Sequence, residues 1–132
     1  MSQARFQVAP TRWRHDESGL IWRLLGPNNR ELGRSAGLFR TSEEAWMSVR
    51  DTISSLPSLE SWVSFDSGEW RWSLNLPSGT ALAVSGRGFR HERDCRYNLS
   101  QFLRVAPPTL IPAQRVTEID LRDSEREGSG AS

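Results

Sequence analysis

Alternation of apolar and polar residues marks the clearest strand in this sequence, the segment 69–76. One side of that segment is entirely apolar and carries Trp70, Trp72, Leu74 and Leu76. Successive side chains of a strand point to opposite faces, so the pattern is typical of a sheet with one buried and one solvated face. The segment 20–25 alternates in the same way, and a Gly-Pro-Asn-Asn turn signal separates it from a second strand-like run at 31–36.

The pattern occurs twice, fifty residues apart and without a gap. The aligned pairs include Trp22/Trp72, Leu24/Leu74, Pro27/Pro77, Leu32/Leu82, Ser35/Ser85 and Phe39/Phe89. Repetition at this period indicates two copies of one supersecondary unit. We therefore expect repeat unit 1 at 12–60 and repeat unit 2 at 61–121, joined in one domain.

A helix is predicted at the same place in each copy. Thr41 and Glu44 form a capping box, and apolar residues at a spacing of four follow it. The first stripe is Ala45, Val49 and Ile53, and the second is Cys95, Leu99 and Leu103, joined by Phe102. His91 occupies the position of Thr41 in the second copy and is a poorer helix cap, so the second helix is expected to fray at its start.

The remaining segments complete the expected architecture. Residues 1–11 are predicted to be a loose leader, 12–15 a short strand, 116–121 a last strand and 122–132 a disordered tail. Each unit is then strand-strand-strand-helix-strand. We expect an α+β fold in which two such β-β-β-α-β units share one antiparallel sheet, with both helices on one face and a pseudo-twofold between the halves.

This arrangement resembles the YegP-like family of small bacterial and archaeal proteins. The matching features are the aromatic-rich strands 20–25 and 69–76, the turn that follows each, the strands ending at Ser35 and Ser85, and the aromatic four residues later. The resemblance implies tandem units, or single units that dimerise, with the C-terminal strands exchanged within a shared sheet. The family usually has Tyr where both copies here have Phe, and it offers no established catalytic residues.

Composition narrows the class of protein. All 17 basic residues are arginine, and the formal net charge is only +1, well below that of a strongly basic nucleic-acid-binding domain. There is a single cysteine, and no apolar run approaches the length of a membrane span. A cytoplasmic protein without membrane contact is expected. The arginines are scattered, which favours genomic base composition over a dedicated anion site as their cause.

Catalytic and metal chemistry lack the residues they need. Two histidines and Cys95 do not form a nucleophile–base pattern, because Cys95 is expected on a buried helix stripe. No zinc spacing occurs, and no cofactor is expected. Arg87, between two glycines, only superficially resembles a phosphate loop. Arg40 and Arg90 each precede a helix, where an anion could bind, although backbone or acidic partners for them are favoured.

The outer sheet face is the candidate binding surface. Arg23 and Arg71 are expected there, and Ile21 beside Arg23 adds an apolar patch that favours a protein partner or self-association. The leading hypothesis is a non-catalytic binding or interaction module. The alternatives are nucleic-acid binding by the arginine-bearing body and a small enzyme or binder of an anionic substrate near Arg40 and Arg90.

Overall fold

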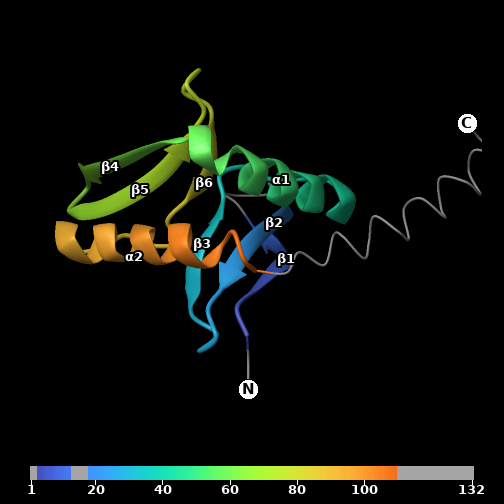
Figure 1. The fold of residues 1–132 in the computed structure, drawn as a ribbon, viewed down its shortest axis with the longest axis horizontal. Helices are drawn as coiled ribbons and strands as arrows, with labels where there is room; N and C mark the ends of the chain where they lie inside the picture. Colours follow the sequence, from blue (N-terminus) through green and yellow to red (C-terminus); the bar gives the residue numbers. More distant parts are fainter. Residues whose placement is uncertain (1–2, 13–17, 110–132) are drawn as a thin grey trace, which may run out of the picture.

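The alternating segments form one six-stranded antiparallel sheet in the computed structural model, which describes residues 3–12 and 18–109. The elements are β1 (Arg5–Arg12), β2 (Ser18–Leu25), β3 (Glu31–Ser35), α1 (Ser42–Ser55), the 3-10 turn η1 (Leu56–Ser58), β4 (Glu60–Asp66), β5 (Glu69–Asn75), β6 (Ala81–Val84) and α2 (Glu92–Val105). The strand order is β1-β2-β3-β6-β5-β4 (Figure 1). The expected α+β class with a single antiparallel sheet is confirmed. Within the described residues, neither helix has the length and apolar character needed to cross a membrane.

Both helices pack on the tryptophan face of the sheet. The strand register forms a row across β2, β3, β6 and β5 that contains Trp22, Ser35, Ala83 and Leu74. The apolar residues of β2 and β5 therefore share the tryptophan face of the sheet. The Trp22 Nε1–H donates to Ser48 Oγ of α1 at 2.9 Å, and the Trp72 Nε1–H donates to Asn98 Oδ1 of α2 at 2.6 Å. α1 lies over β1 and β2, and α2 lies over β3 and β5.

Phe102 of α2 occupies the centre of the core. Its ring lies 5.2 Å from that of Trp72 and 6.4 Å from that of Trp22, and all three side chains are almost completely buried. The space for this ring comes from Gly33 in β3, because a Cβ at that position would lie 2.7 Å from Phe102 Cδ2. The apolar stripe of α2 therefore runs through Cys95, Leu99 and Phe102. Leu103, which we expected on the stripe, is partly exposed.

Equivalent backbone contacts occur fifty residues apart. The Trp22 N–H donates to Ser35 Oγ, and the Trp72 N–H donates to Ser85 Oγ, both at 3.3 Å. Isolated bridges join Leu20 to Phe39 and Trp70 to Phe89. The aromatic before each helix thus pairs with the start of the central strand of its own half, which fixes the path of the chain into the helix.

The N-terminal expectation was wrong. Residues 5–11 are not a loose leader, because β1 pairs with β2 along its whole length, from Arg5 opposite Leu25 to Arg12 opposite Ser18. Phe6 of β1 is buried and packs edge-on against Trp22, with ring centroids 5.7 Å apart. Only Phe6 and Val8 alternate with polar residues before Pro10, and this short pattern was not enough to predict a strand. The rest of the expected strand at 12–15, the strand at 116–121 and the tail at 122–132 lie outside the described residues.

The two helix starts differ as the sequence predicts. Thr41 Oγ1 accepts from the Glu44 N–H at 3.1 Å in a complete capping box, whereas His91 makes no side-chain cap bond. Thr41→Ala is expected to reduce the free energy of unfolding by about 1 kcal/mol, and His91→Thr to increase it by about 0.5–1 kcal/mol. Urea denaturation measures both. A His91→Thr protein no more stable than the parent would show that α2 gains nothing from a cap.

Candidate functional site

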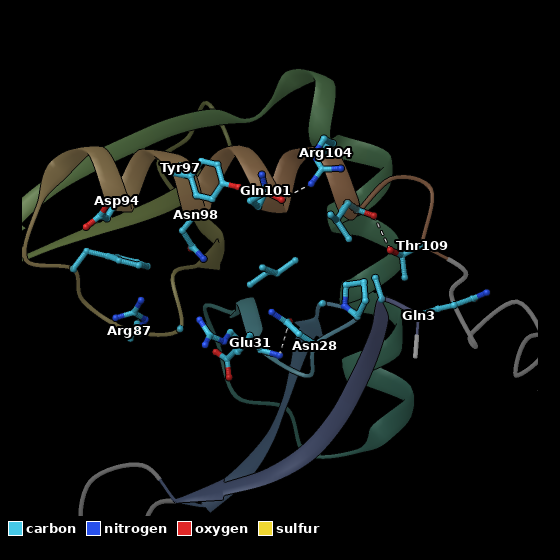
Figure 2. Close-up of a pocket in the computed structure, with 18 of the residues that line it drawn as sticks. Gln3, Asn28, Glu31, Arg87, Asp94, Tyr97, Asn98, Gln101, Arg104 and Thr109 are labelled. Carbon is cyan, nitrogen blue, oxygen red and sulfur yellow. Dashed lines mark hydrogen bonds between the residues drawn. The ribbon is translucent and has the colours of Figure 1, made fainter. Parts of the chain in front are cut away.

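An open groove of about 1260 Å³ runs along α2. One wall is the exposed side of α2, and the other is formed by the β2–β3 turn, the start of β3 and the connection from β6 to α2 (Figure 2). The turn is built by the Gly26 N–H, which donates to the Arg30 carbonyl at 2.8 Å, and by Asn28 Oδ1, which accepts from the Arg30 N–H at 3.1 Å. These bonds place Arg30 at the rim of the groove.

Three arginines from three separate segments border this groove: Arg30, Arg87 and Arg104. The Arg87 guanidinium carbon lies 4.3 Å from the centre of the Phe89 ring, a cation–π geometry. Arg104 donates to Gln101 Oε1 one turn earlier in α2. Among the described residues, none of the three is paired with a carboxylate. Their charges therefore stay available to an anion.

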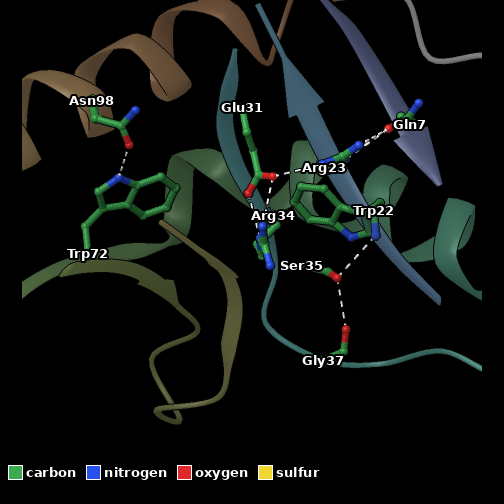
Figure 3. A network of polar contacts seen from close by, with 9 residues as sticks. All are labelled: Gln7, Trp22, Arg23, Glu31, Arg34, Ser35, Gly37, Trp72 and Asn98. Atoms are coloured by element: carbon green, nitrogen blue, oxygen red, sulfur yellow. Dashed lines mark hydrogen bonds and ion pairs between the residues drawn. The ribbon is translucent and has the colours of Figure 1, made fainter. Parts of the chain in front are cut away.

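Two acidic residues, Asp94 and Glu31, line the groove. Asp94 lies 3.8 Å from Arg93 in an exposed ion pair, whereas Glu31 is closely neutralised. Its carboxylate accepts two hydrogen bonds from Arg34, at 2.6 and 2.9 Å, and a longer one from Arg23 at 3.4 Å (Figure 3). Arg23 also donates twice to Gln7 Oε1, at 2.7 and 2.9 Å. Gly86 leaves room for this network, because a Cβ there would overlap the end of the Glu31 side chain and displace it. The Gly86-Arg87-Gly88 segment thus accommodates an ion pair and positions Arg87.

Amide and aromatic side chains complete the α2 wall. The Asn98 Oδ1 accepts a hydrogen bond from the Trp72 Nε1–H, and this bond holds the lining residue in place against the core. Tyr97 is 66% exposed and, like Gln101, lies along the groove (Figure 2). Arginines, amides and an exposed aromatic ring are groups that bind a ligand by hydrogen bonds, charge and stacking.

The structure separates the sequence-predicted site residues. Arg87 lines the groove, whereas Arg23 is held in the Glu31 network. Arg71 is half-exposed and pairs with Glu69 at 3.1 Å. Arg40 and Arg90 are exposed at the starts of the two helices, which lie at opposite ends of the molecule in Figure 1, so they do not form a joint anion site.

The expected apolar patch at Ile21 is absent. Ile21 is only 7% exposed, and Ala9 of the neighbouring strand β1 lies directly opposite it in the same row. Side chains in adjacent strands cover one another, an effect that a single strand's alternation cannot reveal. The outer face around β2 therefore presents the Arg23–Glu31–Arg34 network rather than an apolar surface.

The groups considered for catalysis lie apart from the groove. Cys95 is completely buried, and desolvation raises the pKa of its thiol, which keeps it protonated and unreactive at neutral pH. His91 is exposed at the start of α2. Within the residues that the structure describes, no group of three or more His, Cys, Asp and Glu side chains is arranged to hold a metal ion.

Sequence reasoning missed most of the groove. Arg30, Tyr97, Asn98 and Arg104 were not singled out, although the fifty-residue comparison carries a signal for the helix residues. The α2 groove residues Tyr97, Asn98, Gln101 and Arg104 align with Met47, Ser48, Asp51 and Ser54 of α1. These differences between equivalent positions of the two helices could have indicated a specialised surface on α2.

Comparison with known proteins identifies the fold. No family model and no curated protein matches the sequence. The solution NMR structure of YegP from E. coli, a protein of unknown function, superimposes with a TM-score of 0.55 and 12% identity, over 83% of this chain and 90% of that one. A UPF0339 protein from Shewanella oneidensis gives a TM-score of 0.55 and 11% identity, over 81% and 87% of the two chains. The chain therefore has a YegP-like fold.

Proposed function

We propose that this chain is a non-catalytic binding module that holds an acidic segment of a partner protein in the α2 groove. The observation that carries the proposal is the convergence of Arg30, Arg87 and Arg104 on one groove without carboxylate partners among the described residues. An arginine can bind a carboxylate through two parallel hydrogen bonds, so three of them favour a chain of acidic side chains.

The size and openness of the groove support a chain-like ligand. Pockets for small molecules usually enclose about 300–1,000 Å³, and this groove of about 1260 Å³ is larger and open to solvent. The amide groups of Asn28 and Gln101 can pair with the backbone of an extended peptide. We also propose that the protein is cytoplasmic, a location in which thiols stay reduced and acidic protein segments are present.

Single-stranded nucleic acid is the second candidate, and Tyr97 favours it. Its ring is 66% exposed beside Arg104 and Gln101 on the same helix wall. An aromatic ring flanked by arginines can stack on a base while the guanidinium groups contact phosphates. The modest net charge of +1 makes this candidate the weaker of the two.

The groove arginines provide the test. A labelled short glutamate peptide is titrated at low ionic strength, with fluorescence anisotropy as the readout. The triple variant Arg30→Gln/Arg87→Gln/Arg104→Gln is expected to bind it at least about tenfold more weakly, since charge-assisted contacts are lost. The matched control, Arg40→Gln/Arg90→Gln/Arg96→Gln, removes the same charge outside the groove and is expected to change the affinity by less than about twofold.

Two outcomes would contradict the proposal. Equal weakening by both triple variants would mean that only net charge matters, and absence of peptide binding at low salt would remove the groove as an acidic-segment site. A short oligouridylate in the same assay distinguishes the second candidate. If the nucleic acid binds and Tyr97→Ala weakens only that complex, the nucleic-acid function replaces the peptide function.

We also infer that the two halves are duplicated copies related by a pseudo-twofold. The paired serine contacts at Ser35 and Ser85, and the bridges of Phe39 and Phe89, support this origin. The groove then belongs to one copy's helix and the other copy's turn. A duplication allows such a site to evolve on one side while the equivalent positions on the other side keep their structural role.

A further inference from the structure

The strand β4 forms an unprotected edge of the described sheet. It pairs with β5 in an unbroken register from Glu60 to Asp66, without a bulge, and it contains no Pro. The opposite edge, β1, carries Pro10, which cannot donate a backbone hydrogen bond. Trp62 and Phe65 of β4 are 50% and 57% exposed. Edge strands usually carry features that block further pairing, and β4 lacks two of them, a proline and a bulge, while its charged residues Glu60 and Asp66 lie only at its two ends.

We propose that β4 pairs antiparallel with β4 of a second copy of this chain, with the twofold axis at Trp62. A twofold perpendicular to the sheet keeps the two outer faces on the same side, so the sheet continues from one copy into the next. In this register Trp62 faces its own equivalent. Ser64 faces Glu60 of the second copy, because both lie two residues from the axis.

Charge complementarity selects this register. Ser64 lies directly opposite Arg71 of β5, so Arg71, Ser64 and Glu60 of the second copy form one row on the outer face. Neighbouring strands are about 4.8 Å apart, which puts the outer Cα atoms of this row about 10 Å apart. Extended Arg and Glu side chains bridge that distance over the short serine. The twofold produces two such pairs.

The partners in these pairs are available. Glu60 is exposed and makes no side-chain hydrogen bond or ion pair with any described residue. Arg71 pairs only with Glu69, and both side chains of that pair are about half-exposed. Exposed ion pairs contribute little, so Arg71 can exchange or share its partner at small cost.

Neighbouring registers are less favourable. An axis at Val63 would place Glu60 opposite Asp66 of the second copy, and like charges in directly opposed positions are destabilising. An axis at Ser64 would turn the Arg71 side chains of the two copies toward each other across two serines. The axis at Trp62 avoids both repulsions and adds a cross-strand aromatic pair.

The dimer is expected to be weak and reversible. The exposed parts of Trp62 and Phe65 offer roughly 200–250 Å² per copy, well under the ~800 Å² per partner of a standard interface. Backbone hydrogen bonds along one strand add to this area. We therefore expect a dissociation constant in the micromolar range or above.

Sedimentation velocity of the full chain tests the proposal, over concentrations from about 1 μM to about 1 mM. The expected result is a reversible monomer–dimer equilibrium. Trp62→Ser, Glu60→Arg and Arg71→Glu should each weaken dimerisation by about tenfold or more, because they remove the aromatic pair or create two like-charge contacts. The double variant Glu60→Arg/Arg71→Glu should recover most of the parent affinity, since it exchanges the charges of the same pair.

The control is Asp51→Arg on the exposed side of α1, which should leave the dissociation constant unchanged. Circular dichroism shows whether each variant is folded. If Trp62→Ser does not fold, the charge-exchange variants still test the proposal. A parent chain that stays monomeric over the whole range would overturn the proposal. So would a dimer in which the double variant is no stronger than the single charge reversals.

Discussion

Phe102→Ala is expected to reduce the free energy of unfolding by about 3–5 kcal/mol, the largest effect of any substitution considered for this chain. The side chain is fully buried, and its ring contacts both Trp22 and Trp72. Removing it leaves a cavity at the place where the two halves of the core meet. The tryptophans cannot move in to fill it, because their Nε1 hydrogens are bonded to Ser48 and Asn98.

Urea denaturation followed by tryptophan fluorescence and by circular dichroism measures this loss. Tyr97→Ala is the matched control, since Tyr97 is an aromatic residue of the same helix but 66% exposed, and its change is expected to stay within about 0.5 kcal/mol. Similar losses for the two variants would mean that Phe102 is not the centre of the core.

Gly33→Ala is the second substitution expected to have a large effect, with a loss of about 1–3 kcal/mol in the free energy of unfolding. The added Cβ would lie 2.7 Å from Phe102 Cδ2 and 2.8 Å from Trp72 Cη2, which is shorter than van der Waals contact. Both rings are held inside a packed core, so the sheet or the helix must shift. Gly37→Ala is the control, because a Cβ there would meet nothing within 4 Å.

A double variant tests the cause of this loss. If overlap with the ring is responsible, Gly33→Ala combined with Phe102→Leu should be more stable than the sum of the two single losses predicts, by at least about 0.5 kcal/mol. Additive losses would show that Gly33 is needed for its backbone and not for the space it leaves. The measurement is the same urea denaturation.

These two positions explain why the halves of the core are not identical. Fifty residues before Phe102 lies Thr52, and fifty residues after Gly33 lies Ala83. One ring already fills the space between the two tryptophans, so the equivalent position on α1 holds a small side chain. Thr52 is fully buried and its hydroxyl has no hydrogen-bond partner among the described residues, which fits a position constrained by size rather than by polarity.

The candidate site was less predictable than the fold. Arg87 was recognised and lies at the groove, but Arg30 and Arg104 become neighbours of Arg87 only through packing of α2 against the β2–β3 turn of the other half. Arg23 was expected on the outer face as a binding residue, and it is bound to Glu31 and Gln7. Whether an arginine has a partner depends on residues in other strands, which local patterns do not report.

The local elements follow from short-range patterns in the sequence. Alternation around Trp22 and Trp72, the capping box at Thr41 and the fifty-residue repetition are short-range patterns, and they predicted strands, helices and a single antiparallel sheet. Burial and strand pairing depend on the packing of distant segments, which those patterns cannot specify. In the folded chain, residues 5–12 form an edge strand, Ile21 is buried and Phe102 lies at the centre of the core. The physical reason is that burial, pairing and charge neutralisation depend on neighbours distant in the chain, whereas periodicity and capping depend only on residues a few positions apart.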